Sequence, residues 1–247
     1  MRPVELAFQI VELLGQHQPA GVTELAKLAG IPKSTAQRAL GALHKTGWIE
    51  PASDDRGRWT LSLRALIAAG RANSALETLR GIAIPVMDEL RRYSEETVHL
   101  NFRFDRLLIL IERLDGIKPV RYFFPYGAIS TLHATASGRA VLARLNAEEL
   151  DTYLDRPMRA ITRKTIVDPV AFRAEIEATR ARGYAITFGG NRPDVHAVGA
   201  AITDPTGRPI AAMTISAPSE RLDDGMAAAY GPRLADGARR ISLGLAA

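Results

Sequence analysis

The feature that most constrains the fold is a pair of short amphipathic segments joined by a glycine and a proline near the N-terminus. A helix over 24–29, with Thr23 as its N-cap, is predicted to end at Gly30. Ile31-Pro32 then opens a second helix, to about Lys45, because the fixed φ and missing N–H of proline suit a helix start. The buried stripe of this second helix consists of Ala36, Leu40 and Leu43. Two helices joined by so short a turn predict a helix-turn-helix.

The neighbouring segments complete a winged helix-turn-helix. Residues 4–16 predict a preceding helix with one apolar side. Two strands are predicted over 48–50 and 58–63, and the polar segment 51–57 joins them as a hairpin. The order of helices and strands predicts a DNA-binding domain over residues 1–65.

The distribution of charge supports a nucleic-acid partner. The whole chain carries a net charge of +5, with a pI of about 9.7. Between Lys27 and Arg64 there are seven cations and three acids, a local excess that favours a polyphosphate. Winged helices also serve as protein-interaction modules, but the basic bias argues against that reading. We therefore expect double-stranded operator DNA as the partner.

The exposed side of the second helix supplies the candidate DNA contacts. Gln37 and Arg38 are assigned to base readout, since glutamine and arginine make bidentate contacts with adenine and guanine. Phosphate contacts are expected along the helix and at the wing. The residues assigned to them are Lys33, Ser34, Thr35, Lys45, Arg56 and Arg58.

The rest of the chain predicts a linker and a second domain. Residues 66–84 are predicted to form a linker helix, and Pro85 is expected to break or kink it and to start a new helix at Val86. The second domain then spans 85–247. Its predicted strands are 97–102, 107–112, 120–124, 184–188, 196–203 and 209–216, and its further helices are 134–145, 147–154, 169–182 and 226–245. Two groups of strands, separated in the sequence by a group of helices, indicate an α+β domain with an antiparallel sheet.

Several kinds of site are not expected from the composition and motifs. The chain has no cysteine, and its five histidines show no metal-ligand spacing. No G-x-S-x-G, P-loop or GxGxxG motif occurs, so neither a catalytic site nor a cofactor is expected. His133 is interpreted as a structural hydrogen-bonding group at a helix start. An enzyme, and a DNA-binding protein whose second domain serves only for assembly, remain as alternatives.

The N-terminal residues and the hydropathy predict a cytoplasmic location. The segment Met1 to Glu5 leads directly into an amphipathic pattern, unlike a secretory signal. No uncharged run approaches the roughly 20 residues that span a bilayer. No membrane partner is expected.

Five ordered segments carry a resemblance to a known family. They are 31–43 (IPKSTAQRALGAL), 61–70 (LSLRALIAAG), 133–143 (HATASGRAVLA), 182–185 (RGYA) and 211–216 (AAMTIS). With these segments the chain resembles the IclR family of bacterial transcriptional regulators over nearly its whole length.

The resemblance implies a fold, an assembly and a function. It implies a GAF-like second domain that binds a small-molecule effector, and a homodimer or homotetramer on a pseudo-palindromic operator. The expected role is repression of a catabolic operon. A ligand would act through the helix at 66–83 by shifting the relative orientation of two recognition helices.

The resemblance also implies where the effector binds. The corresponding residues are Gly127, Ala128, Asn191, Ala201, Thr214 and Ser216. Backbone N–H groups of the Gly127 loop and the two hydroxyls on one strand face predict a carboxylate or carbonyl group on the ligand. Alternatively, Thr214 and Ser216 form sheet surface only. The chain departs from the family's usual residues at 188–190 and 200–202, so no family ligand is carried over.

Overall fold

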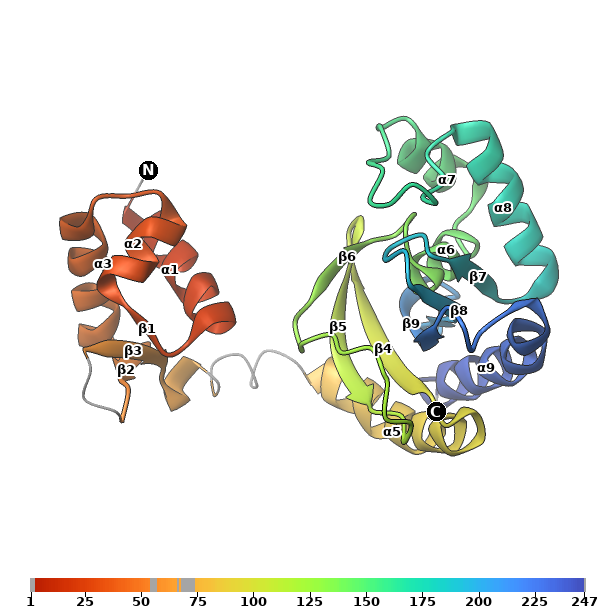
Figure 1. The fold of residues 1–247 in the computed structure, drawn as a ribbon, viewed down its shortest axis with the longest axis horizontal. Helices are drawn as coiled ribbons and strands as arrows, with labels where there is room; N and C mark the ends of the chain where they lie inside the picture. Colours follow the sequence, from red (N-terminus) through yellow and green to blue (C-terminus); the bar gives the residue numbers. More distant parts are fainter. Residues whose placement is uncertain (1–2, 54–56, 66, 68–73, 247) are drawn as a thin grey trace. The chain divides into compact units, whose positions relative to one another are not determined.

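The computed structural model describes residues 3–53, 57–65, 67 and 74–246 (Figure 1). The chain divides into two compact units, Met1–Leu76 and Glu77–Ala247. Each unit has its own hydrophobic core, as expected for domains of ordinary size.

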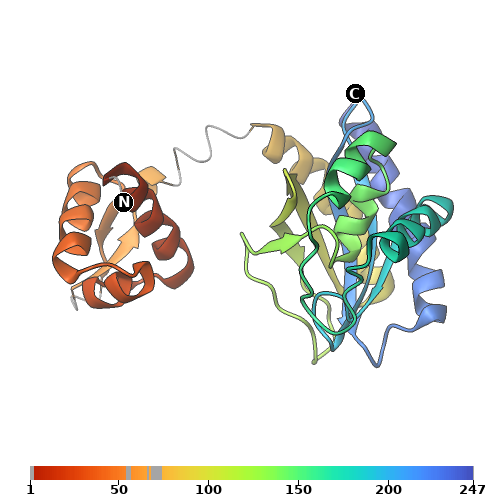
Figure 2. The same ribbon diagram turned by 90° about the horizontal axis from the view of Figure 1, so that it is seen from above.

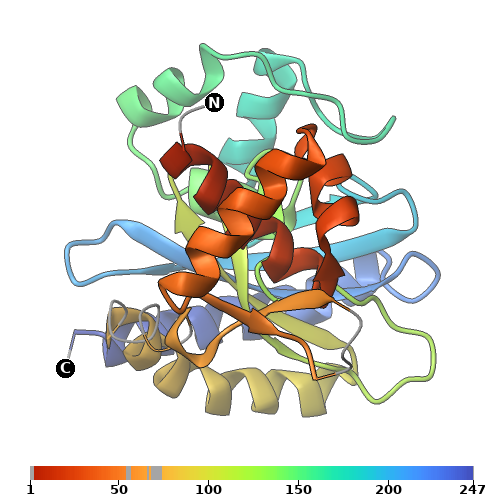
Figure 3. The ribbon, with the colours of Figure 1, turned by 90° about the vertical axis from the view of Figure 1, so that its left-hand side faces the viewer.

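The N-terminal unit is a three-helix winged fold (Figure 3). Its elements are α1 (Pro3–His17), β1 (Ala20–Gly21), α2 (Val22–Ala29), α3 (Lys33–Lys45), β2 (Ile49–Pro51) and β3 (Arg58–Leu61). The three strands form an antiparallel sheet in the order β1-β3-β2. Apolar residues at helical spacing meet in the core, including Leu6, Ile10, Leu14, Leu25, Leu40 and Ile49. The predicted winged helix-turn-helix is therefore confirmed.

Local details of this unit differ from the sequence-based prediction. Gly21, not Thr23, is the N-cap of α2, and no side chain caps that end. Pro32 lies one residue before α3 as its extended N-cap, and Gly30 ends α2 in the left-handed conformation. The strand β1 was not predicted, because two residues show no periodicity and its pairing with Trp59 and Arg58 is a tertiary contact.

The C-terminal unit is built on one six-stranded antiparallel sheet. Its strands are β4 (Thr97–Phe104), β5 (Leu107–Leu114), β6 (Ile129–Thr131), β7 (Ala185–Phe188), β8 (Val195–Thr203) and β9 (Pro209–Pro218). They lie in the order β6-β5-β4-β9-β8-β7. The α+β class with an antiparallel sheet is confirmed.

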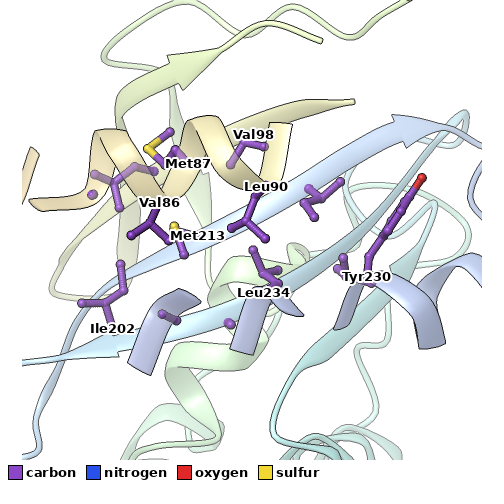
Figure 4. Packing of buried hydrophobic residues seen from close by; sticks show 14 of the residues in the cluster. Val86, Met87, Leu90, Val98, Ile202, Met213, Tyr230 and Leu234 are labelled. Carbon is purple, nitrogen blue, oxygen red and sulfur yellow. The ribbon is translucent and has the colours of Figure 1, made fainter. Parts of the chain in front are cut away.

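Two long helices cover one face of this sheet (Figures 1 and 2). They are α5 (Ser74–Ser94) and α9 (Asp224–Gly244). Figure 4 shows Val86, Met87 and Leu90 of α5 packed among strand and α9 residues in the larger core. At roughly 1.5–3 kcal/mol for each large apolar side chain buried, this layer is a major source of the unit's stability.

Of the break or kink predicted at Pro85, the break and the new helix at Val86 are wrong. The helix α5 continues through Pro85 to Ser94. Leu79 and Ala83, which precede the proline, are buried in the same core as Val86. Packing on both sides of Pro85 thus outweighs the roughly 3 kcal/mol that an interior proline costs a helix.

Three shorter helices cover the opposite face. They are α6 (Ala136–Leu142), α7 (Ala147–Leu154) and α8 (Pro169–Arg182). Each has a polar N-cap that accepts from a backbone N–H, namely Thr135, Asn146 and Asp168. The fully buried Phe172 and Ile176 of α8 pack with Leu142 and Leu150 in a second core.

The predicted strand over 120–124 is also wrong. This segment has no regular structure, and the edge strand is instead β6, in which Ile129 pairs with Ile109 of β5 and Thr131 with Leu107. The β-branched and aromatic residues of 120–124 are typical of a strand, but all of them are exposed or half-buried. The segment leads to the loop that contains Gly127 and Ala128.

A close backbone approach joins α6 to the sheet. A Cβ on Gly199 of β8 would lie 2.4 Å from the backbone carbon of Ala136. Only glycine therefore allows the start of α6 to rest directly on the strand.

We expect Gly199→Ala to lower the free energy of unfolding of the C-terminal unit by about 1–3 kcal/mol, because the methyl group overlaps the α6 backbone. Urea unfolding followed by circular dichroism measures this change. Gly81→Ala is the matched control: Gly81 is exposed on α5, and nothing lies within 4 Å of its added Cβ. The control is expected to be neutral or slightly stabilising. Equal effects of the two substitutions would contradict the close approach.

Candidate DNA-binding face and effector cavity

The outer side of α3 presents the predicted DNA contacts together. Lys33, Ser34, Gln37, Arg38 and Lys45 are exposed, and Thr35 is half-buried. The opposite side of the helix is buried through Ala36, Leu40 and Leu43. The helix therefore offers a continuous polar and basic face of a kind that fits a DNA groove.

The wing and the end of α3 are held by hydrogen bonds. Gln18 Oε1 accepts from the Leu61 N–H at 2.8 Å and from the Thr60 hydroxyl at 2.9 Å. Arg64 donates to the carbonyl of Thr46 at the end of α3, at 2.8 Å. Arg58 is half-buried at the start of β3, and the predicted contact Arg56 lies outside the described residues.

A cavity opens on the sheet face of the C-terminal unit that carries α6. Its empty volume is about 670 Å³, including its mouth, which is within the range of small-molecule sites. We call it the sheet cavity. Its walls come from β4, β5, β7, β8 and β9, the start of α6, and two loops that contain Ala128 and Asn191.

Four of the six predicted effector residues lie in the wall of the sheet cavity. Ala128 and Asn191 belong to its loops, and Thr214 and Ser216 project from alternate positions of β9. Gly127 is not among the residues that line it, and Gly127 N–H donates to the Leu110 carbonyl at 2.8 Å. The Ala128 N–H likewise donates to Pro125 at 3.1 Å, so both loop donors are engaged within the protein.

Ala201 does not reach the sheet cavity. It shares a face of β8 with Ala197, which lines the cavity, but Gly199 lies between them. Because the backbone of Ala136 rests on Gly199, α6 closes the cavity at that point. Ala201 instead lies beside Ala140 on the far side of this contact.

Other cavity residues were missed by the sequence analysis. His99 and Asn101 project from β4, and Leu110 and Arg192 also line the cavity. The signal for the β4 residues was the alternation of polar His99 and Asn101 with apolar neighbours on a buried strand. For Arg192 no local signal exists, since it lies on an irregular segment.

The polar groups deep in the cavity are neutral. Burial lowers the pKa of His99 to about 4, with a further contribution from the cation of Arg113 that Asp115 opposes. His99 Nδ1 lies 3.4 Å from Ser216 Oγ. The hydroxyl oxygen of Thr214 is buried and has no hydrogen-bond partner among the described residues.

Aromatic side chains and Arg192 form the outer wall. The Arg192 guanidinium lies 5.0 Å from the centre of the Phe124 ring and 5.9 Å from that of Tyr122. Tyr122 also donates from its hydroxyl to Asp194. These contacts join the loop after β7 to the segment before Gly127, across the cavity.

A buried carboxylate connects the Gly127 loop to α5. Glu112 of β5 accepts from the Tyr126 hydroxyl at 2.8 Å and from Arg80 of α5 at 2.6 Å. Burial alone would raise the pKa of Glu112, but the hydrogen bonds from Arg80 and Tyr126 hold it below its usual value. Tyr126, beside the Gly127 loop, and Arg80 of α5 therefore both donate hydrogen bonds to the Glu112 carboxylate.

The interpretation of His133 as structural is confirmed. Its Nδ1 lies 3.1 Å from the Tyr153 hydroxyl, and its Nε2 lies 2.8 Å from the Arg159 carbonyl. No metal site or membrane-spanning helix is found in the described part of the chain. Within it, no cluster of three or more histidine, aspartate or glutamate side chains could hold a metal ion. In the same part of the chain no helix has both the length and the apolar composition that crossing a bilayer requires.

We expect acid to destabilise the C-terminal unit through His99. Its folded pKa of about 4 lies below the ordinary 6.5, so the unfolded chain binds the proton more readily. This contribution is complete above pH 6.5 and is lost as the pH falls toward 4. Between pH 7 and 5 the wild-type unit is expected to lose about 2 kcal/mol more than His99→Gln.

Urea unfolding at pH 7 and pH 5, followed by circular dichroism, measures this difference. Both tryptophans, Trp48 and Trp59, lie in the N-terminal unit, so fluorescence reports that unit separately and serves as the control. Identical pH dependence in wild type and variant would show that His99 is not responsible.

Comparisons with known proteins agree over the whole chain. Residues 3–53 match the IclR helix-turn-helix domain, and residues 75–243 match the bacterial transcriptional regulator IclR C-terminal domain. The transcriptional repressor IclR of Escherichia coli (strain K12) is 29% identical over 225 residues, which cover 90% of this chain and 81% of that protein. The transcriptional repressor AllR of the same organism is 30% identical, covering 92% of this chain and 83% of the relative.

Solved structures agree with this assignment. The crystal structure of the Thermotoga maritima IclR covers 99% of this chain and 98% of its own, with a TM-score of 0.80 and 26% identity. An IclR homologue from Microbacterium hydrocarbonoxydans, complexed with 4-hydroxybenzoate, shares the fold, with a TM-score of 0.84, 23% identity and 99% coverage of each chain. The protein has an N-terminal DNA-binding domain and a C-terminal ligand-binding domain, and it belongs to the IclR family of transcriptional regulators.

Proposed function

We propose that this protein represses a catabolic operon and responds to a small metabolite that carries a carboxylate or carbonyl group. The observation that carries the proposal is the sheet cavity, which combines apolar walls with convergent neutral polar groups and one cation. A domain that served only for assembly would have no need of such a cavity. Relatives named as the transcriptional repressor IclR and the acetate operon repressor support the direction of control.

On the DNA side, α3 enters the major groove of a pseudo-palindromic operator, and a homodimer or homotetramer presents two such helices. Gln37 and Arg38 read base edges from the exposed face. Lys33, Ser34, Thr35 and Lys45 set the position on the phosphates, with Arg56 and Arg58 at the wing. The protein acts in the cytoplasm, where its operator lies.

The effector acts through α5. Binding in the sheet cavity displaces the Gly127 loop, and Tyr126 passes this displacement to Glu112, which also holds Arg80 of α5. The orientation of the recognition helices then shifts. To control transcription, the ligand has to bind one of these two orientations more tightly than the other. A ratio of roughly 100-fold between the two affinities corresponds to about 2.7 kcal/mol.

We expect Arg38→Ala to weaken operator binding by about 1–3 kcal/mol and to relax specificity at one base pair, because a bidentate base contact is lost. Lys33→Ala is the matched comparison, and it should weaken binding to all sequences alike, since phosphates carry no sequence information. Titration of operator and scrambled duplexes at fixed salt distinguishes the two. Unchanged operator affinity in Arg38→Ala would refute the base-reading role.

We expect Tyr126→Phe to reduce the effect of a ligand on operator affinity by roughly 10-fold or more, because a hydrogen bond to a charged carboxylate is worth about 1.5–3 kcal/mol. The ligand is first found by thermal-shift screening of carboxylic acids, since binding to the folded state raises the melting temperature. Operator affinity is then measured with and without it.

Tyr93→Phe is the control, because it removes a hydroxyl from α5 about 20 Å along the helix from Arg80. The control should respond as the wild type does. If Tyr126→Phe binds the ligand and responds in full, Glu112 does not couple the cavity to α5.

A further inference from the structure

We infer that Arg192 is the anion-recognition residue of the sheet cavity, and that the cavity takes a monocarboxylic acid with an apolar body the size of a single ring. The inference rests on the proposed function, in which this cavity binds the effector. It narrows the ligand from a carboxylate or carbonyl compound to one chemical class.

The charge of the cavity points to a single anionic group. Among the described residues that line it, Arg192 alone carries a charge, because no carboxylate is present and His99 is neutral. No aspartate or glutamate in the described ranges forms an ion pair with Arg192 within 4.0 Å. One unneutralised cation favours a monoanion, whereas a second ligand carboxylate would lack a partner and a ligand cation would be repelled.

The geometry of Arg192 leaves its donors available. Its guanidinium carbon lies over the faces of Phe124 and Tyr122. Its N–H groups donate no hydrogen bond within the described part of the chain, so they can bind a carboxylate through two parallel bonds. The side chain is exposed at the cavity mouth, so a ligand can reach it.

The backbone N–H groups of the Gly127 loop are not available for a carboxylate. The N–H groups of Gly127 and Ala128 donate to the carbonyls of Leu110 and Pro125. The loop therefore lines the cavity but offers neither of these N–H groups to an anion. A side-chain cation on the facing loop is then the strongest partner for the negative charge.

The size and polarity of the cavity determine the body of the ligand. Leu110, Phe124, Ile129, Val195 and Ala197 line it, and a two- or three-carbon acid would leave most of this surface uncovered. At about 25 cal/mol for each Å² of apolar area, a ring that covers these walls gains affinity that a short acid lacks.

The inner wall favours one further neutral group on that body. Thr214 lines the cavity, and its hydroxyl oxygen is buried without a hydrogen-bond partner among the described residues. A hydroxyl or carbonyl group of the ligand could satisfy it, and the neighbouring Ser216 hydroxyl projects from the same strand face. Because these partners are neutral, the second group on the ligand is neutral as well.

The test uses the full chain and four probes of matched shape or charge. They are benzoate, the neutral benzamide, the dianion isophthalate and the short acid pyruvate. Calorimetric titration is expected to show benzoate binding at least about 10-fold more tightly than each of the others. Benzamide lacks the charge-assisted pair, which contributes about 1.5–3 kcal/mol. Isophthalate has a second carboxylate without a partner, and pyruvate leaves the apolar walls uncovered.

Arg192→Gln should weaken benzoate binding by about 10-fold or more and leave benzamide binding unchanged. Arg121→Gln is the matched control: it removes the same charge from an exposed position that does not line the cavity. It should leave the affinities for both probes unchanged. Arg192→Lys, which keeps the charge but not the two parallel bonds, should give an intermediate benzoate affinity.

Three results would overturn the inference. They are tighter binding of benzamide, isophthalate or pyruvate than of benzoate, an Arg192→Gln variant that binds benzoate as the wild type does, and no binding of benzoate at all. None of these decides the proposed function, which is tested separately by operator binding and by its response to ligands found in a broad screen. A short or neutral ligand that alters operator binding would overturn the ligand class alone.

Discussion

The alternation of side chains along the central strands is the constraint on which both the core and the sheet cavity depend. In β4, Val98 and Leu100 enter the large core, while His99 and Asn101 face the cavity. In β9, Met213 and Ile215 enter the same core, and Thr214 and Ser216 face the cavity. Because the period of a strand is two, a shift of one residue would place polar groups in the core and apolar groups in the cavity.

The cavity exists because the second face of the sheet is only partly covered. Helices α6, α7 and α8 pack over one part of this face, and α6 meets β8 at Gly199 with no side chain between them. Beyond that contact the sheet is covered by loops, whose aromatic residues and Arg192 close the outer wall. A site bounded by loops on a rigid sheet suits a binding function, since loops can change without loss of the core.

The sequence predicted what local chemistry controls. The helical spacing of Ala36, Leu40 and Leu43 and the turn at Gly30 and Pro32 identified the helix-turn-helix, because each signal lies within a few residues of the structure it predicts. The predictions failed where distant contacts prevail. A helix break was among the expectations at Pro85, but α5 is continuous there because residues on both sides of the proline pack in the same core. A strand was predicted over 120–124, but no neighbouring strand pairs with this segment.

The candidate sites follow the same division. The residues of the α3 face were available from the sequence alone, since one helix presents them. Thr214 and Ser216 were assigned through the family resemblance, and they share one strand face. The tertiary structure decided the rest. Ala201 is separated from the cavity by a backbone contact more than 60 residues away in the chain, and Arg192 reaches it only because two irregular segments stack against each other. The periodicity of a sequence shows which residues share a face of one helix or strand. A cavity is lined by residues from several such elements, and only the packed fold specifies which of them meet.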